Sequence, residues 1–486
     1  MNHRRLNHDV LSLIMDISNR QTLCCLMQTC KEFCRLAAKH ILAGGVTLRS
    51  QVQACTFLPF LLADPTHRLP LLRTLKISIF TDVRRCPTAD CVMAGLFRLL
   101  ANGGGLLDLD LAPAEQLLSS HSQLPSAIAG IKTLRCLRLV DVGTLAAGML
   151  AQLQPQLVTA DLHYGPKRER RADFDRNPFH LLRHSTQTLR NLSLSSAVIH
   201  HLDASALIPC FANVTALTLE CMDVPSIQPY VRAFPRLQSL TVDLDEDGST
   251  IAKDFNQLML QRTSNQQKQK TLGSWPRLAS FTSGNPCTLY CLGIACPISS
   301  VLLCDVVEGW EPIATALSEA LSDAHPIELT LELIKPYTIT DLEFLPVFDK
   351  PALRDLQVLV LRLHLRHEDQ DIDWPRILEL LLCRIVAQLS SLRSLELYIS
   401  CYAVVYPYQP VEDQPSPEER PLSTLERGLA EWDPSSFAQR AFDASPKGTL
   451  KSIAISQAEH RTRGDFKLEY GAAADCDKSK LGSDWH

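Results

Sequence analysis

The sequence predicts an α/β protein in which a short N-terminal α-helical unit precedes an irregular solenoid with parallel strands. Three observations predict this class: an amphipathic segment at 6–33, a leucine-containing phrase that recurs along the rest of the chain, and helical stripes between its copies. We place the helical unit at 1–45, the solenoid at 46–458 with a proline-rich insertion at 406–421, and a loose C-terminal tail at 459–486.

The N-terminal segment has the pattern of two or three short helices, each with one apolar face. In the first helix, apolar residues recur at the spacing of a single buried face: Val10, Leu11, Ile14 and Ile17. A second apolar stripe continues to Ile41, and Gly44 and Gly45 follow as a stop signal. Helices of this length bury little apolar area, so we expect the unit to need a further surface for its stability.

A phrase of the form Leu-x-x-Leu-x-Leu recurs after this unit. Its second and third apolar residues are two positions apart, so they share one face of a strand, and the residue between them points to the other face. We expect a strand at each copy. Full copies begin at Leu72, Leu106, Leu134, Leu189, Val214, Leu237, Leu356, Leu392 and Leu450, and weaker ones at Leu157, Leu278 and Ile298.

Helical stripes lie between the copies, and polar segments interrupt the pattern. The clearest stripes are at 90–101, 311–324 and 374–389. One strand and one helix cannot bury both apolar faces alone, whereas stacked copies can, which predicts a parallel sheet inside and helices outside. We expect loops at the charged segment 164–178 and at the polar segment 264–274.

Composition bounds the environment and the partners of the chain. The net charge is −5, from 48 basic and 53 acidic residues, so no global field favours nucleic acid or an anionic membrane. The 17 cysteines are an odd number, scattered through apolar segments as at Cys24, Cys136, Cys210 and Cys383, which favours buried free thiols in a reducing compartment. No run approaches the ~18 to 20 apolar residues of a membrane span. We expect a soluble, cytoplasmic or nuclear protein with no membrane or nucleic-acid partner.

Two groups of residues could suggest a metal site, and neither has the required pattern. DLDEDG at 243–248 has the start of a calcium loop, but a strand rather than a helix precedes it. A second group has spacings that fit a structural zinc site poorly: Cys287, Cys291, Cys296 and Cys304. The chain also lacks a nucleophile elbow, H-E-x-x-H, a Walker loop and G-x-G-x-x-G. We expect no metal, no cofactor and no enzyme activity.

The N-terminal segment resembles the F-box, which docks onto a Skp-family adaptor in cullin–RING ubiquitin ligases. The resemblance lies in LNHDVLSLIM and TLCCLMQTCKEF. The matching positions are Leu6, Asp9, Val10, Leu11, Ile14, Leu23, Cys30, Lys31 and Phe33. Two positions depart from the family pattern: Asn7 replaces the usual proline, and Ser18 stands where an apolar residue is common.

The recurring phrase resembles the leucine-rich-repeat family. Copies at Leu189, Val214 and Leu237 begin 25 and 23 residues apart, within the ~20 to 29 of that family. Other copies lie farther apart, and the family's asparagine after the strand is not regularly present, so another parallel α/β arrangement stays open. An F-box followed by degenerate leucine-rich repeats is similar to a large fungal class of proteins.

These resemblances imply a substrate receptor of an SCF-type ubiquitin ligase that performs no chemistry itself. Its partners would be a Skp-family adaptor, through it a cullin–RING ligase, and an unknown protein target. The residues implied for the adaptor interface or the core beneath it are Leu6, Val10, Leu11, Ile14, Leu23, Met27 and Phe33. For the target we expect the exposed strand positions between buried residues: Lys76, Arg138, Ser193, Thr218, Thr241 and Glu396.

Two alternatives stay open. A repeat-based scaffold would bind partners through the solenoid and recruit no ligase, and the departures at Asn7 and Ser18 favour it. An α/β enzyme without a recognised motif would require a deep pocket of convergent polar groups at the strand ends, whereas a solenoid predicts an open sheet.

Overall fold

The structure is a computed structural model that divides the chain into two compact units. The first contains Met1–Glu220 and Arg232–Arg236, and the second contains Cys221–Val231 and Leu237–His486. The sequence did not predict this division. The residues that the structure describes are 8–79, 87–154, 156–165, 177–196, 208–220, 226–244, 255–304, 311–333, 344–405 and 420–471.

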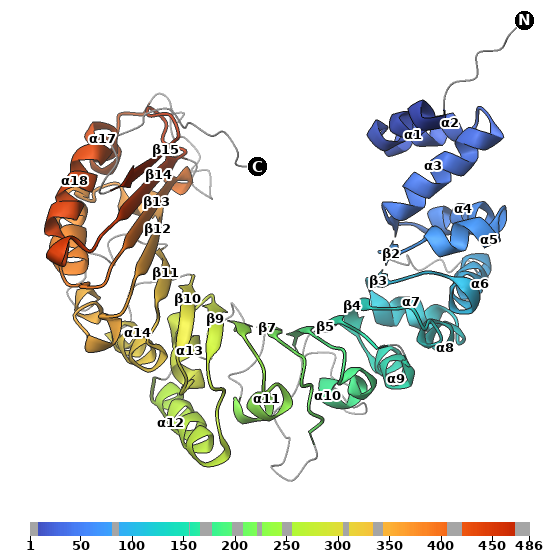
Figure 1. Cartoon of the computed structure of the whole chain (residues 1–486), viewed down its shortest axis with the longest axis horizontal. Helices are drawn as coiled ribbons and strands as arrows, with labels where there is room; N and C mark the ends of the chain where they lie inside the picture. Colours follow the sequence, from blue (N-terminus) through green and yellow to red (C-terminus); the bar gives the residue numbers. More distant parts are fainter. Residues whose placement is uncertain are drawn as a thin grey trace, which may run out of the picture. The chain divides into compact units, whose positions relative to one another are not determined.

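Parallel strands alternate with helices in both units, which confirms the prediction of an α/β protein (Figure 1). In the first unit, β1 to β7 pair in chain order and all the pairs are parallel. These strands are β1 (Val46–Leu48), β2 (Thr74–Ile77), β3 (Asp108–Leu111), β4 (Cys136–Val142), β5 (Thr159–Tyr164), β6 (Asn191–Ser195) and β7 (Ala216–Glu220).

The second unit continues the same order from β8 to β14 and ends differently. Its last strand, β15, pairs antiparallel with β14, whereas the preceding pairs are parallel. The strands are β8 (Ser239–Asp243), β9 (Leu278–Ser283), β10 (Ile298–Leu303), β11 (Glu328–Leu333), β12 (Val358–Arg366), β13 (Ser394–Cys401), β14 (Ser452–Ala458) and β15 (Phe466–Gly471).

Three helices lead the first unit, and further helices connect its strands. Within this unit, taken by itself, the connecting helices lie on one side of the strands (Figure 1). The helices are α1 (His8–Ile17), α2 (Arg20–Met27), α3 (Lys31–Ala43), α4 (Gln51–Leu62), α5 (Pro65–Arg68), η1 (Leu69–Leu71), α6 (Pro87–Gly103), α7 (Ala114–Ser120), α8 (Leu124–Ala129), α9 (Thr144–Gln152), α10 (Pro178–Leu181) and η3 (Arg183–Ser185).

The helices of the second unit also connect successive strands, and α11 (Gln228–Ala233) has residues in both units. The others are α12 (Phe255–Leu272), α13 (Pro286–Leu292), α14 (Glu311–Ala324), η5 (Leu345–Val347), η6 (Pro351–Leu353), η7 (His367–Asp369), α15 (Trp374–Leu380), η8 (Leu381–Val386), α16 (Tyr402–Val405), α17 (Thr424–Glu431), α18 (Pro434–Ala444) and η9 (Pro446–Gly448).

The leucine phrase forms strands because its alternation matches the two faces of a sheet. In β4, Leu137 and Leu139 are buried, and Arg138 between them is exposed. The first leucine of the copy, Leu134, is also buried and lies in the turn that enters the strand. The core of each unit is therefore a stack of leucines between the sheet and its helices.

The helical stripes at 90–101 and 311–324 are α6 and α14, as predicted, and the stripe at 374–389 forms α15 followed by a turn of π-helix, η8. The loop expected at 264–274 is wrong, because most of it belongs to α12. Polar side chains fill the buried face of this helix and bond to the backbone of the next helix. Asn265 Nδ2 donates to Cys291 O at 3.0 Å, and Gln269 Nε2 donates to Gly293 O at 2.8 Å.

The segment from 459 to 471, expected to begin a loose tail, is instead packed and bonded. Arg461 lies against Glu426 of α17, with 2.7 Å between Nε and Oε1, and these side chains are only 8% and 3% exposed. β15 then completes the sheet edge. Its residues alternate between half-buried and exposed, so its apolar signal is weak in the sequence. The remainder of the expected tail, most of the 406–421 insertion and most of the 164–178 segment lie outside the described residues.

Candidate interaction surfaces

The three N-terminal helices enclose a small core of their own. It consists of Met15, Leu23, Leu36 and Ala37, and these partly buried residues pack against it: Leu11, Leu26, Met27, Phe33 and Ile41. Asn19 begins α2 by accepting a hydrogen bond from Thr22 N at 2.9 Å. Ser18 Oγ donates to Ile14 O at 2.5 Å, so the polar residue at this position is satisfied by the preceding turn.

Helix α1 presents a second apolar stripe to solvent. Val10 is 43% exposed, Leu13 61% and Ile17 79%. Their spacing of three and four residues places them on one face of the helix, and Ile14 between them is half-buried. The single buried face that the sequence predicted is therefore wrong for Val10 and Ile17, because Met15 and Leu11 supply the contacts to the core.

The structure separates the residues implied for the adaptor interface into three groups. Leu23 lies in the core of the helical unit, whereas Leu11, Met27 and Phe33 lie at its border. Val10 is exposed and Ile14 half-buried. Leu6 lies outside the described residues. Leu13 was missed, although the stripe that it forms with Val10 and Ile17 is visible in the sequence as a spacing of three and four.

The strand face of the first unit aligns its four expected target-binding residues. They lie in one register row, which crosses the sheet as Thr47, Lys76, Asp110, Arg138, Asp161, Ser193 and Thr218. Lys76 and Arg138 are exposed, and Ser193 and Thr218 are half-buried. The row alternates in charge from β2 to β5 and is uncharged on β6 and β7.

Four charged groups lie in a series on this face: Arg138, Asp161, His163 and Glu220. Arg138 Nε is 3.2 Å from Asp161 Oδ2, and His163 Nε2 is 2.9 Å from Asp161 Oδ1. On the other side of the imidazole, His163 Nδ1 is 4.0 Å from Glu220 Oε2. Positive and negative groups therefore alternate from β4 to β7 when the imidazole is protonated.

Asp161 and His163, the two central groups of this series of charges, each shift the pKa of the other. Burial opposes ionisation of Asp161, but hydrogen bonding and attraction to His163, together with Ser193 and Arg138, hold the pKa of Asp161 below its usual value. The hydrogen bond to Asp161 raises the pKa of His163 against the effect of burial, and the carboxylates of Asp161 and Glu220 add to it.

Several charged residues of this face were missed by sequence reasoning. Asp108 and Asp110 alternate with buried leucines in LLDLDL, so the same phrase could have identified them. Burial raises the pKa of Asp108, with a contribution from Asp110 and an opposing one from Lys76. The pairing of Asp161 with His163 follows from the local strand pattern, but the approach of Glu220 depends on the register of β5, β6 and β7.

The strand face of the second unit contains the remaining two expected residues in one register row. The row runs as Thr241, Thr282, Leu302, Thr330, Val360, Glu396 and Ala454. Polar contacts gather at the carboxyl ends of its later strands. His364 Nε2 lies 2.6 Å from Glu332 Oε1, and Ser400 Oγ donates to Glu459 Oε2 at 2.9 Å.

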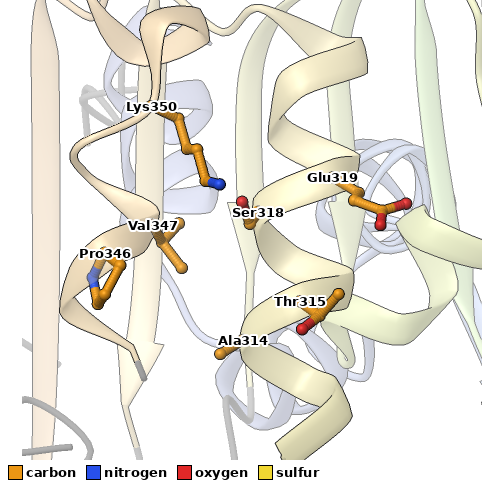
Figure 2. A pocket seen from close by; sticks show the side chains of 7 residues that line it. All are labelled: Ala314, Thr315, Ser318, Glu319, Pro346, Val347 and Lys350. Atoms are coloured by element: carbon orange, nitrogen blue, oxygen red, sulfur yellow. The ribbon is translucent and has the colours of Figure 1, made fainter. Parts of the chain in front are cut away.

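A cleft lies in the helical layer of the second unit, between α14 and the η5 turn (Figure 2). Its volume is about 520 Å³, and Ala314, Thr315, Ser318, Glu319, Pro346, Val347 and Lys350 line it. Lys350 points toward Ser318, whereas Glu319 lies on the far side of α14 from Lys350 (Figure 2). No histidine or cysteine is among these residues.

The four clustered cysteines are largely buried, whereas Cys24, Cys210 and Cys383, which the sequence also predicted to be buried, are exposed. Burial raises the pKa of Cys287 to about 12 and that of Cys296 to about 11, so both thiols stay protonated at neutral pH. Cys291 is also buried, and Cys304 is half-buried. Within the part of the chain that the structure describes, no group of three or more His, Cys, Asp or Glu residues could hold a metal ion. Of the DLDEDG segment, the described residues are Asp243 and Leu244.

Comparison with known proteins leaves the family undetermined. No model of a protein family matches the chain, and no curated protein matches its sequence. Over the described ranges, no helix combines the length and the apolar character that crossing a bilayer would require.

Proposed function

We propose that this protein is the substrate-receptor subunit of an SCF-type cullin–RING ubiquitin ligase. In this proposal the N-terminal unit acts as an F-box that binds a Skp-family adaptor, and the strand faces of a degenerate leucine-rich-repeat solenoid bind a protein target. The chain contributes no catalytic group. It would accelerate ubiquitin transfer by holding the target close to the ligase.

The exposed apolar stripe of α1 carries the proposal. A small helical unit with its own core has no internal reason to place Leu13 and Ile17 in water, where they are 61% and 79% exposed. Fully burying one such side chain stabilises a complex by roughly 1.5 to 3 kcal/mol. The stripe lies in the segment whose sequence resembles an F-box, and for this reason we assign it to the adaptor rather than to another partner.

The target surface in this proposal is the strand face. Lys76, Arg138 and Glu396 are exposed between buried neighbours, so they are available for contacts and contribute little to the core. The chemistry of these faces differs between the units.

Binding of purified Skp-family adaptor to the full chain tests the proposal. Leu13→Asp and Ile17→Asp change exposed side chains and leave the core residues Met15 and Leu23 in place, so both variants should fold. We expect each to weaken adaptor binding at least tenfold, because an aspartate would be buried without a partner (about 1.4 kcal/mol per tenfold). Surface plasmon resonance measures the affinity, and circular dichroism checks the helix content.

Val52→Asp is the matched control, since Val52 on α4 is 72% exposed and lies outside the F-box-like segment. Unchanged binding by this variant would localise the interface to α1. A folded wild-type chain that does not bind the adaptor, or an equal loss with Val52→Asp, would contradict the receptor role and leave the repeat-based scaffold.

A further inference from the structure

The residues that immediately precede β2 to β7 (the entry residues) form a hydrogen-bonded row at the end of the sheet where these strands begin. This end of the first unit is called the entry edge. The backbone carbonyl of Arg73 accepts hydrogen bonds from Leu107 N at 2.8 Å and from Asp108 N at 3.0 Å. Leu107 O accepts from Arg135 N at 2.7 Å, and Arg135 O accepts from Val158 N at 2.7 Å. These bonds place consecutive entry residues side by side.

The hydrogen-bonded row continues in the same way through β7. Val158 O accepts from Arg190 N at 2.8 Å, and Arg190 O accepts from Thr215 N at 2.9 Å. An arginine therefore immediately precedes every second strand: Arg73 precedes β2, Arg135 precedes β4 and Arg190 precedes β6. All three arginines are exposed. Neighbouring strands lie about 4.8 Å apart, so the three cations recur about every 10 Å.

The described segments around these arginines contain only positive or uncharged side chains. The short segments that lead into β2 to β7 contain no aspartate or glutamate among the described residues, which are 69–73, 104–107, 130–135, 156–158, 184–190 and 211–215. Lys132 and Arg183 in these turns or next to them are also exposed.

The contacts that two of these guanidiniums make are with uncharged groups. Arg73 Nη1 donates to Gly105 O at 3.3 Å, and Arg135 Nη1 donates to Gln156 O at 3.0 Å. These bonds orient the side chains along the edge and leave the remaining donors of each fork available to a ligand. A basic edge on a chain of net charge −5 is a local feature that composition does not reveal.

We propose that this edge of the first unit binds an acidic segment of a partner protein. An unfolded peptide favours the polyproline II conformation, which has three residues per turn, so carboxylates at every third residue lie on one side and recur about every 9 Å, close to the arginine spacing. Between the arginines lie Leu107, which is 37% exposed, and Val158, which is half-buried, so apolar residues of the peptide would find contacts between its carboxylates. The inference does not depend on the receptor role of α1.

A single-stranded nucleic acid fits this edge less well. Its recognition relies on aromatic side chains that stack on bases. The residues that immediately precede β2 to β7 are not aromatic, and Phe211, in the segment that leads into β7, is buried.

A fluorescein-labelled peptide of about 15 residues tests the proposal, with glutamate at every third position among proline, serine and leucine to match the three-residue turn of polyproline II. Fluorescence anisotropy measures its binding to the full chain, beside the same peptide with glutamine for glutamate and a labelled single-stranded oligonucleotide. We expect the glutamate peptide to bind most tightly. Arg73→Gln, Arg135→Gln and Arg190→Gln together should weaken its binding about tenfold at low salt.

The control variant combines Lys39→Gln, Arg49→Gln and Arg98→Gln, which remove the same charge from exposed positions of the first unit away from this edge. It should change the affinity less than about twofold. Replacing the three edge arginines by lysine keeps the charge and should retain most of the binding, even if the glutamine variant folds poorly. Equal losses with the two glutamine triples, no binding by the wild type, or tighter binding of the oligonucleotide would overturn the proposal.

Discussion

The strand faces of the two units are built on the same alternation but differ in chemistry. In the first unit the central row reads Lys76, Asp110, Arg138 and Asp161 from β2 to β5. The corresponding row of the second unit contains Thr241, Thr282, Leu302, Thr330 and Val360 before it reaches Glu396. The buried leucines of the phrase define which positions face outward, and they leave the identity of the outward residues free. Surface chemistry can therefore vary while the fold is kept.

The units also differ in how far water reaches one arginine–carboxylate pair in each. In the first unit the paired charges lie on the strand face, where Arg138 is 50% and Asp161 25% exposed. In the second unit Arg461 and Glu426 lie between α17 and the segment that leads to β15, and both are nearly inaccessible. Arg461 also donates to Arg420 O at 2.6 Å and to Pro421 O at 2.9 Å. The Arg138–Asp161 pair is accessible to a ligand, whereas the Arg461–Glu426 pair anchors the segment that leads to β15.

Removing one partner of the buried Arg461–Glu426 pair should have the largest effect on stability. Arg461→Met leaves Glu426 buried without its guanidinium partner, and we expect the free energy of unfolding to fall by about 3 to 5 kcal/mol. Urea denaturation of the full chain measures the loss, and hydrogen exchange should show it first in β14 and β15. Arg440→Gln is the control, because Arg440 pairs with Glu379 on the surface. A loss below about 1 kcal/mol for Arg461→Met would show that the segment from 459 to 471 is not held by this pair.

Breaking the strand-face pair should cost less, because water reaches it. Asp161→Asn removes the carboxylate that lies between Arg138 and His163, and we expect a loss of about 1 to 2 kcal/mol. The pKa of His163 should fall toward that of a free imidazole, since its hydrogen bond to Asp161 is the main cause of the upward shift. Proton NMR titration of the imidazole measures this change. An unchanged pKa in the variant would contradict the pairing.

The two units should respond to pH in opposite directions near neutrality. The pKa of His163 is raised, so its contribution to stability is fully present below the unfolded value of about 6.5 and is lost as pH rises through the folded pKa. Burial lowers the pKa of His460, whose Nε2 donates to Glu426 O at 3.1 Å. The unfolded chain therefore takes up a proton at His460 first, and the second unit loses stability as pH falls below about 6.5.

Hydrogen exchange at pH 5.5 and 7.5 separates the two responses, after correction for the intrinsic exchange rate. We expect protection in β5 and β6 to be greater at the lower pH and protection in β14 to be greater at the higher pH. His163→Gln should remove the first difference and His460→Gln the second, each with little effect on the other unit. The same sign of change in both units would contradict the assignment of these two histidines.

The sequence predicts the parts of this structure that depend on local alternation. Strands at Leu72, Leu134 and Leu392 follow directly from the phrase, because alternating burial is a property of the strand itself. The exposed row follows from the same rule. Local alternation does not specify which residues of other strands lie beside a given residue. The approach of Glu220 on β7 to His163 on β5 therefore could not be predicted.

The remaining errors also arise from contacts between distant segments. The second half of α12, from 264 to 272, was interpreted as a loop because its buried residues are polar. Hydrogen bonds to backbone groups of α13 and its C-cap make Asn265 and Gln269 compatible with burial. Arg461 looked like part of a tail because its partner lies 35 residues earlier in the chain. The apolar stripe of α1 was assigned to the core because spacing identifies a face and does not identify what covers it.

The smallest expected effects are those of the outward residues themselves. Lys76→Gln in the first unit and Glu396→Gln in the second should each change the free energy of unfolding by less than about 0.5 kcal/mol, because both side chains are exposed and neither fills the core. Chemical denaturation checks this. Any loss of binding to a partner by these variants would then report a lost contact rather than a damaged fold. A larger loss of stability at Lys76 alone would mean that the charges of the first face are needed to hold Asp108 and Asp110 together, and the two faces would differ in structural role as well as in chemistry.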